Sequence, residues 1–193
     1  MNQEKKYRRD IILRQPWFNN IEFDKRRVFE KLLVENPIIA NQVKSLLVVP
    51  HEDCLTNIDN YKSDLKPYNL RKLKEDKYIT LVPRITPNFN SEVQCFIIVT
   101  SNYITPTNNP CFYSYVLNVY CMCQFDAWNL DNFQERPLKL AGIVNGLLDN
   151  EKLSNIGRLE WKNTTMLTVD SNIGGYVSSF LLIQGEDDVL VKD

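Results

Sequence analysis

The segment from Phe112 to Phe125 constrains the fold more than any other part of the sequence, because its apolar residues recur with the period of two that is typical of a β-strand. One face of that strand carries apolar or aromatic side chains: Tyr113, Tyr115, Leu117, Val119, Cys121 and Cys123. The opposite face is also partly apolar, with Val116, Tyr120 and Met122. A strand with apolar residues on both faces is covered on both sides. We therefore expect it to lie in the centre of a sheet.

Apolar residues at helical spacing predict three helices around this strand. Two lie near the N-terminus, at 24–35 and 37–50, and form a helical hairpin. The third spans 136–150, after the long strand. It contains Gly142 and Gly146, and each glycine destabilises a helix by roughly 1 kcal/mol relative to alanine. We expect a close backbone approach at these two positions.

Four further β-rich segments complete the pattern. Residues 78–82 and 93–100 predict a β-hairpin, and residues 157–169 and 176–183 predict two closing strands. The polar stretch between 51 and 76 reads as a long connection. The expected fold is α+β, with an antiparallel or mixed β-sheet of about five strands, a packed helix and an N-terminal α-hairpin.

The composition is that of a globular protein, because 44% of the 193 residues are hydrophobic and 24% are charged. We expect an N-terminal basic arm at 1–20, a single α+β domain at 21–185 with its core at about 77–185, and an acidic tail at 186–193. No apolar run approaches the ~20 residues that span a bilayer. The N-terminus is charged where a signal peptide is apolar, so we expect synthesis in a cytosol and no membrane contact.

The five cysteines predict neither a metal site nor a disulfide framework. They are Cys54, Cys95, Cys111, Cys121 and Cys123. In a cytosolic chain we expect them to be reduced. The spacing of Cys121 and Cys123 is too short for a zinc knuckle, and on a strand they lie on one face as small buried apolar side chains.

Catalysis has little support in the sequence. The single histidine, His51, lies close to Cys54, which raises the alternative of a small cysteine/histidine hydrolase. Such pairs normally come together from distant segments, however, whereas these residues are neighbours in a loop. Glycine-rich phosphate loops are absent from the sequence. We therefore expect no catalytic residues, no cofactor and no metal.

The charge distribution raises a second alternative, a nucleic-acid-binding module. Residues 1–80 carry 16 basic and 12 acidic side chains, and residues 81–193 carry 7 and 12. Basic clusters near the N-terminus would contact nucleic acid or an acidic partner: Lys5, Lys6, Arg8, Arg9, Lys25, Arg26 and Arg27. From Phe89 to Leu130 there is no lysine or arginine, so the aromatic residues of the sheet do not form a base-stacking platform.

The order of segments resembles that of tailed-phage tail terminator and tail completion proteins, which also serve as head-to-tail connector rings. In that family a β-hairpin and a long strand are followed by an arginine-containing entry into a helix and by two closing strands. Here the entry is Asn132–Pro137, which contains Arg136. The resemblance is one of pattern, covers about half to two thirds of the chain, and leaves the N-terminal α-hairpin and the connection at 51–76 without a counterpart.

The resemblance implies a virion structural protein, as in the neck of a crAss-like or podovirus-like phage, assembled in the bacterial host cytoplasm. Such a subunit forms a homo-oligomeric ring, contacts adjacent portal, connector or tail proteins, and surrounds genomic DNA without sequence-specific contact. A ring needs an interface that joins two different faces of the subunit. On this reading the expected interface residues are Phe89, Tyr103, Ile104, Trp128 and Arg136.

Overall fold

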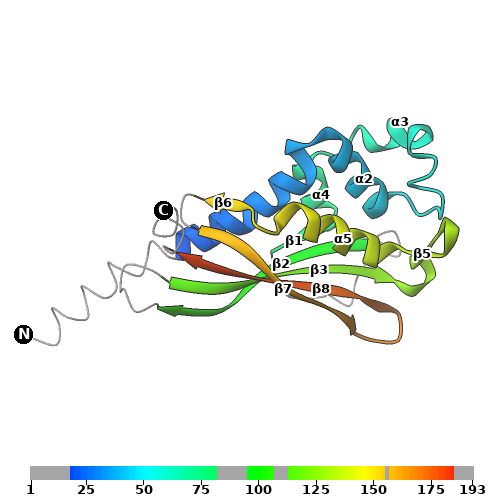
Figure 1. The fold of residues 1–193 in the computed structure, drawn as a ribbon. Helices are drawn as coiled ribbons and strands as arrows, with labels where there is room; N and C mark the ends of the chain where they lie inside the picture. The colour runs from blue at the N-terminus through cyan, green and yellow to red at the C-terminus, as the bar shows by residue number, and fades with distance from the viewer. Residues whose placement is uncertain (1–17, 82–94, 107–112, 155–156, 185–193) are drawn as a thin grey trace, which may run out of the picture.

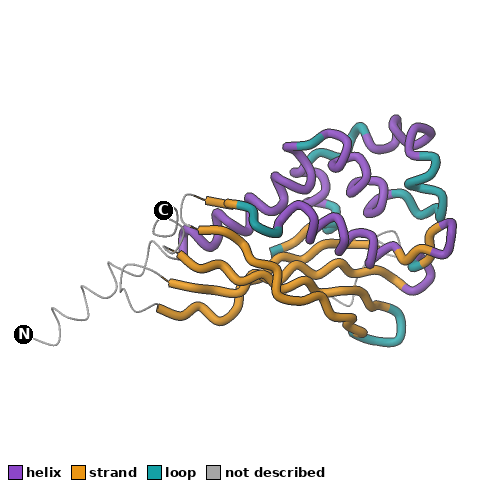
Figure 2. The backbone as a smooth tube through the Cα atoms, viewed as in Figure 1, coloured by secondary structure: helices purple, strands orange, loops and turns teal. Residues whose placement is uncertain are grey.

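The computed structural model describes residues 18–81, 95–106, 113–154 and 157–184 (Figure 1). These residues form a mixed sheet of six strands, and helices cover one of its faces (Figures 1 and 2). The α+β prediction is therefore confirmed. The strands, in the order in which they lie across the sheet, are β1 (Ile79–Thr80), β2 (Cys95–Pro106), β3 (Tyr113–Gln124), β8 (Ile173–Gln184), β7 (Gly157–Thr168) and β6 (Lys152–Ser154).

The long strand β3 lies between β2 and β8, which confirms its predicted central position. All six residues of its predicted inner face are buried, because the helices pack against them. On the other face Met122 is buried, whereas Val116 and Tyr120 are partly exposed. The four long strands β2, β3, β8 and β7 are antiparallel to their neighbours.

The predicted hairpin between 78–82 and 93–100 is wrong, because β1 runs parallel to β2. A parallel pair needs a crossover connection of a dozen or more residues, and the segment between β1 and β2 is long enough for one. The predicted closing strand at 176–183 begins earlier, at Ile173, so Gly174 and Gly175 belong to β8. A Cβ at Gly175 would lie 2.1 Å from the carbonyl oxygen of Cys121, so only glycine fits this close strand pairing.

The predicted helical hairpin is confirmed. Residues 18–30 are α-helical and continue into a π-helical segment, η1 (Lys31–Glu35). The helix α2 (Pro37–Val48) follows, with the side chain of Asn36 accepting hydrogen bonds from the amides of Ile38 and Ile39. Asparagine at this N-cap position accepts hydrogen bonds from backbone amides of the first turn that have no partner within the helix.

The polar stretch from 51 to 76 contains more structure than the sequence pattern indicates. It forms three short helices, η2 (Ile58–Tyr61), α3 (Lys62–Leu65) and α4 (Leu70–Glu75). After β3 the chain forms η3 (Phe125–Ala127), β4 (Asn129–Leu130), η4 (Asp131–Phe133) and β5 (Gln134–Glu135), and then α5 (Arg136–Leu148), which packs on the sheet.

Two buried features correct the predictions from the sequence. Cys95 and Cys123 lie directly opposite each other on β2 and β3 and form a disulfide, whereas we expected reduced cysteines. Cys54 and Cys121 are free and buried. A Cβ built at Gly142 or Gly146 of α5 would have no atom within 4 Å, so the expected close backbone approach is absent from the described part of the chain.

Candidate subunit interface

The outer edge of β7 offers a pairing surface among the described residues. β6 pairs only with the beginning of β7, at Gly157 and Arg158. From Asn163 to Thr168 no described strand pairs with the outer edge, and all six residues of this stretch are uncharged. Natural proteins commonly protect such edges with charged residues, proline or bulges, and here Lys162 and a bulge lie directly before the stretch but not inside it. We call residues 163–168 the open β7 edge.

Side-chain hydrogen bonds of Thr164 connect the open β7 edge to the rest of the fold. The hydroxyl of Thr164 accepts hydrogen bonds from the Asn145 amide of α5 at 3.0 Å and from the Trp161 indole at 3.1 Å. The same hydroxyl lies 2.9 Å from that of the buried Ser178 on β8. Beside these contacts, Met166 is 59% exposed. The edge thus combines a side chain that is hydrogen-bonded to α5 and β8 with an exposed apolar side chain.

The second half of β2, from Ser101 to Pro106, forms the opposite edge of the sheet, and it contains two of the predicted interface residues. Tyr103 is 79% exposed and has a positive φ of 53°, in a bulge between Asn102 and Thr105. Ile104 is partly buried. Phe89 lies outside the described residues. This half of β2 is also uncharged, and its bulge lies inside the stretch, whereas the bulge of β7, between Trp161 and Asn163, lies directly before the open β7 edge.

Trp128 lies inside an aromatic cluster that ties the end of β3 to β8. Its ring centroid is 5.3 Å from that of Phe125 and 6.3 Å from that of Tyr176. The Tyr176 hydroxyl in turn donates a hydrogen bond to Glu135 at the start of α5. Trp128 therefore has a packing role within the subunit, although part of its surface is exposed.

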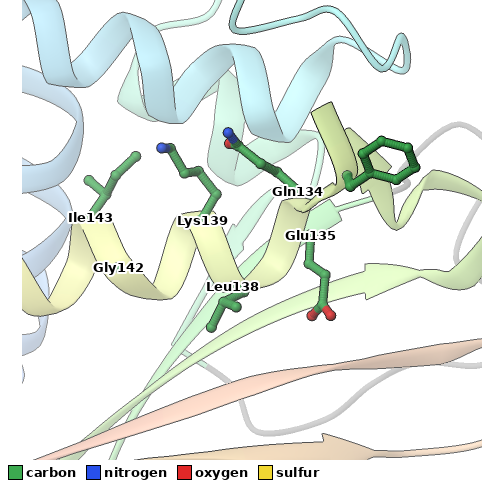
Figure 3. A pocket seen from close by; sticks show the side chains of 7 residues that line it. Gln134, Glu135, Leu138, Lys139, Gly142 and Ile143 are labelled. Carbon is green, nitrogen blue, oxygen red and sulfur yellow. The ribbon is translucent and has the colours of Figure 1, made fainter. Parts of the chain in front are cut away.

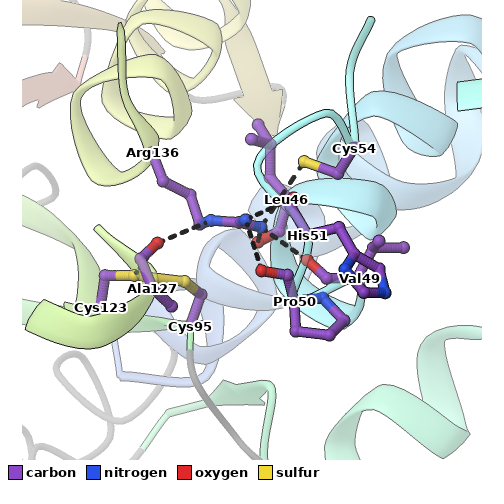
Figure 4. Close-up of a disulfide and its surroundings, with 9 residues drawn as sticks. All are labelled: Leu46, Val49, Pro50, His51, Cys54, Cys95, Cys123, Ala127 and Arg136. Atoms are coloured by element: carbon purple, nitrogen blue, oxygen red, sulfur yellow. Dashed lines mark hydrogen bonds between the residues drawn. A yellow bond between two sulfur atoms is a disulfide. The ribbon is translucent and has the colours of Figure 1, made fainter. Parts of the chain in front are cut away.

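The structure places Arg136 inside the subunit, with only 1% of its surface exposed. A side chain in this position cannot reach a neighbouring subunit. Its guanidinium donates hydrogen bonds to five backbone carbonyls, those of Ala127, Leu46, Val49, Pro50 and His51, at 2.7 to 3.3 Å (Figure 4). Burial lowers the pKa of Arg136. The arginine at the helix entry is therefore an internal clamp between α5, η3 and the end of α2.

A shallow depression of about 530 Å³ lies over the first turns of α5. Figure 3 shows Glu135 and Leu138 pointing to one side of the helix, and Gln134, Lys139 and Ile143 to the other. The polar side chains that line the depression therefore point away from one another, whereas a small-molecule site needs polar groups that converge. Within the described residues no group of three or more His, Cys, Asp or Glu side chains could hold a metal ion.

The basic residues of the first helix are largely neutralised by their own neighbours. Arg26 pairs with Glu30 at 2.9 Å. Arg27 pairs with Glu30 at 2.7 Å and with Glu35 at 2.6 Å, and the hydrogen bond from Arg27 lowers the pKa of Glu30. Lys25 is partly buried, and Lys5, Lys6, Arg8 and Arg9 lie outside the described residues. Paired arginines offer less positive charge to a phosphate backbone.

The surroundings of Cys54 oppose the chemistry of a nucleophilic thiol. Cys54 is buried, and this burial raises the pKa of its thiol, which reduces the fraction of reactive thiolate. Its sulfur lies 3.5 Å from an Arg136 nitrogen. The ring of His51 stacks on Tyr61, with a centroid distance of 5.9 Å. These contacts give Cys54 and His51 packing roles.

Within the described residues, this α+β sheet ends in uncharged stretches at 163–168 of β7 and 101–106 of β2, and backbone groups on such edges are able to pair with a strand of another chain. A family model described as YomW matches residues 40–181. The chain therefore belongs to the YomW family, which is phage-derived (SPBeta-type), and the protein is a phage protein. The predicted phage origin is confirmed, whereas the tail-terminator and neck-ring assignment stays a prediction.

No curated protein matches the chain. In the part of the chain that the structure describes, no helix is both long enough and apolar enough to cross a membrane.

Proposed function

We propose that this phage protein is a structural subunit of the virion that assembles with copies of itself into a ring at the head-to-tail junction, around the DNA channel. The observation that carries the proposal is the open β7 edge, six uncharged residues with which no described strand pairs on their outer side. Unpaired backbone groups on such an edge are a template for a strand of another chain. In a ring, one edge of each subunit contacts the opposite edge of the next subunit.

The helical layer supplies a second surface for the adjacent portal, connector or tail proteins. Four large apolar side chains on the helical hairpin are between 52% and 73% exposed: Phe18, Phe23, Val34 and Ile38. Exposed apolar groups of this size favour burial against a partner. Because they lie on the helices and the open β7 edge lies on the sheet, one subunit can contact copies of itself and a different protein at the same time.

Under this proposal the DNA passes through the ring without sequence-specific contact. The chain from residue 81 onward has more acidic than basic side chains, so it lacks the surplus of cations that binds phosphates tightly. Weak phosphate contacts allow DNA to move through a channel.

Mass photometry and negative-stain microscopy of the purified full-length protein test the proposal. We expect discrete closed rings whose population rises with protein concentration. A protein that stays monomeric up to its solubility limit, or that forms open filaments, would contradict the ring. Filter binding to duplex DNA over a range of salt concentrations is the companion measurement. Tight binding at low salt that falls steeply as the salt concentration rises would favour the nucleic-acid alternative.

A further inference from the structure

The registers of the strands show which parts of the two sheet edges lie at the same level. One row across the sheet contains Ile79 of β1, Ile97, Cys121, Tyr176 and Met166 of β7. The next row joins Thr80 to Thr165 in the same way. The strand β1 therefore lies level with the middle of the open β7 edge, on the opposite side of the sheet.

The other short strand, β6, shows the converse relation. Its residue Lys152 pairs with Arg158 of β7, and the row continues through β8 and Ser114 to Thr105 of β2. At that level β1 does not extend the sheet. The strand β1 thus extends the β2 edge at the level where the β7 edge has no additional strand. The strand β6 extends the β7 edge at the level where the β2 edge has none. The two edges are complementary in outline.

The strand directions favour a second copy as the partner. The four long strands alternate in direction, so β2 and β7 run antiparallel to each other. A rotation about an axis along the strands keeps the direction of every strand. It therefore brings β1 and β2 of the next copy alongside β7 in the antiparallel sense, which continues the pattern of the sheet.

We propose that the open β7 edge of one subunit receives the β1–β2 edge of a second copy of this chain. This inference rests on the proposed ring and names the two surfaces that form it. Neither Ile79–Leu81 nor Asn163–Thr168 carries a charge, so the two edges meet without repulsion or the desolvation of ions. Leu81, 39% exposed, and Met166, 59% exposed, provide apolar area at the junction.

The substitution Met166→Lys tests the proposal, because it introduces a charge at the centre of the open β7 edge, where natural edge strands use lysine to prevent pairing. We expect the concentration needed for ring assembly to rise about tenfold or more. The matched control is Phe133→Lys, which introduces the same charge at a fully exposed apolar side chain of η4, outside both proposed contact surfaces. Circular dichroism should show that both variants are folded.

The outcomes separate this inference from the proposed function. Rings that form from Met166→Lys at the wild-type concentration would overturn the β7 interface and leave the ring itself in place. A wild-type protein that never forms rings would overturn both.

A photo-crosslinking residue in place of the exposed Thr165 gives a second, independent readout in assembled wild-type rings. We expect mass spectrometry to locate its crosslinks in residues 79–81 and 97–99 of another copy. Crosslinks to β7 of another copy would show a two-fold β7–β7 contact and overturn the proposal.

Discussion

Arg136 connects three segments that are far apart in the sequence. The carbonyls that accept its hydrogen bonds include Leu46 and Val49 at the end of α2, where the helix dipole places partial negative charge. A guanidinium has five N–H donors in a fixed plane, which suits several carbonyls at once. The buried charge is thus stabilised by backbone dipoles.

We expect Arg136→Met to lower the free energy of unfolding by about 3–5 kcal/mol, because it leaves buried carbonyls without a donor. Arg136→Lys should recover only part of this loss, since an ammonium group cannot reach all of these carbonyls. Urea unfolding followed by circular dichroism measures both. The control is Lys139→Met, one turn further along α5 and exposed, and a loss of the same size there would contradict the clamp.

Tyr115 and Asp24 form a buried pair in which the tyrosine hydroxyl donates to the carboxylate at 2.7 Å. Burial, together with the Asp24 carboxylate, raises the pKa of Tyr115 above its usual range and that of Tyr113 to about 12. The folded protein therefore keeps these protons at a pH where the unfolded chain has lost them. Stability from this source is complete below about pH 10 and falls as the pH rises above it.

Urea unfolding between about pH 8 and about pH 11 measures this dependence. We expect Tyr115→Phe to reduce the loss of stability at high pH and to lower stability at pH 8 by about 1–3 kcal/mol, because Asp24 loses a hydrogen-bond donor. Tyr103→Phe, at a side chain that is 79% exposed, is the control and should behave like the wild type. An unchanged pH profile in Tyr115→Phe would contradict the assignment.

At the scale of single elements, α5 carries glycines that its own packing does not require. Gly142 and Gly146 lie on its exposed side, and a Cβ at either position would meet no atom within 4 Å. Gly175 on β8 is the opposite case, because a Cβ there would overlap the backbone of β3. The same residue type is thus essential in the strand and replaceable in the helix.

We expect Gly142→Ala and Gly146→Ala each to raise the free energy of unfolding of the isolated subunit by about 1 kcal/mol, through helix propensity alone. Gly175→Ala should instead lower it by about 2 kcal/mol or more. Thermal and urea unfolding measure all three variants. Destabilisation by either α5 alanine would mean that the helix needs the glycine for a contact within the subunit.

At the scale of the whole molecule, the proposed assembly joins uncharged edges, and its dependence on salt should reflect that. Raising the ionic strength from about 0.1 M to about 1 M shortens the Debye length from about 10 Å to about 3 Å and screens ionic contacts. We expect the fraction of subunits in rings, measured by mass photometry, to stay constant or to rise. Dissociation of the rings at high salt would indicate an ionic interface instead.

Much of this architecture follows from local patterns in the sequence. The period of two in β3 and the helical spacing in α2 and α5 predict the elements, the central strand and its buried face, because these patterns depend on residues a few positions apart. The candidate interface was harder to predict. Tyr103 is exposed as an interface residue must be, but the open β7 edge and Met166 gave no local signal.

The pattern of apolar residues thus specified the longer helices and strands and the buried face of β3, but not the short helices between 51 and 76 or the short strands β4, β5 and β6. Folding in three dimensions established the parallel direction of β1, the Cys95–Cys123 pair, the buried position of Arg136 and the place of β7, whose residues 163–168 pair with no described strand on their outer side. Each of these depends on which distant segments become neighbours. That choice is made by packing and backbone hydrogen bonding over the whole chain, and no short stretch of residues encodes it.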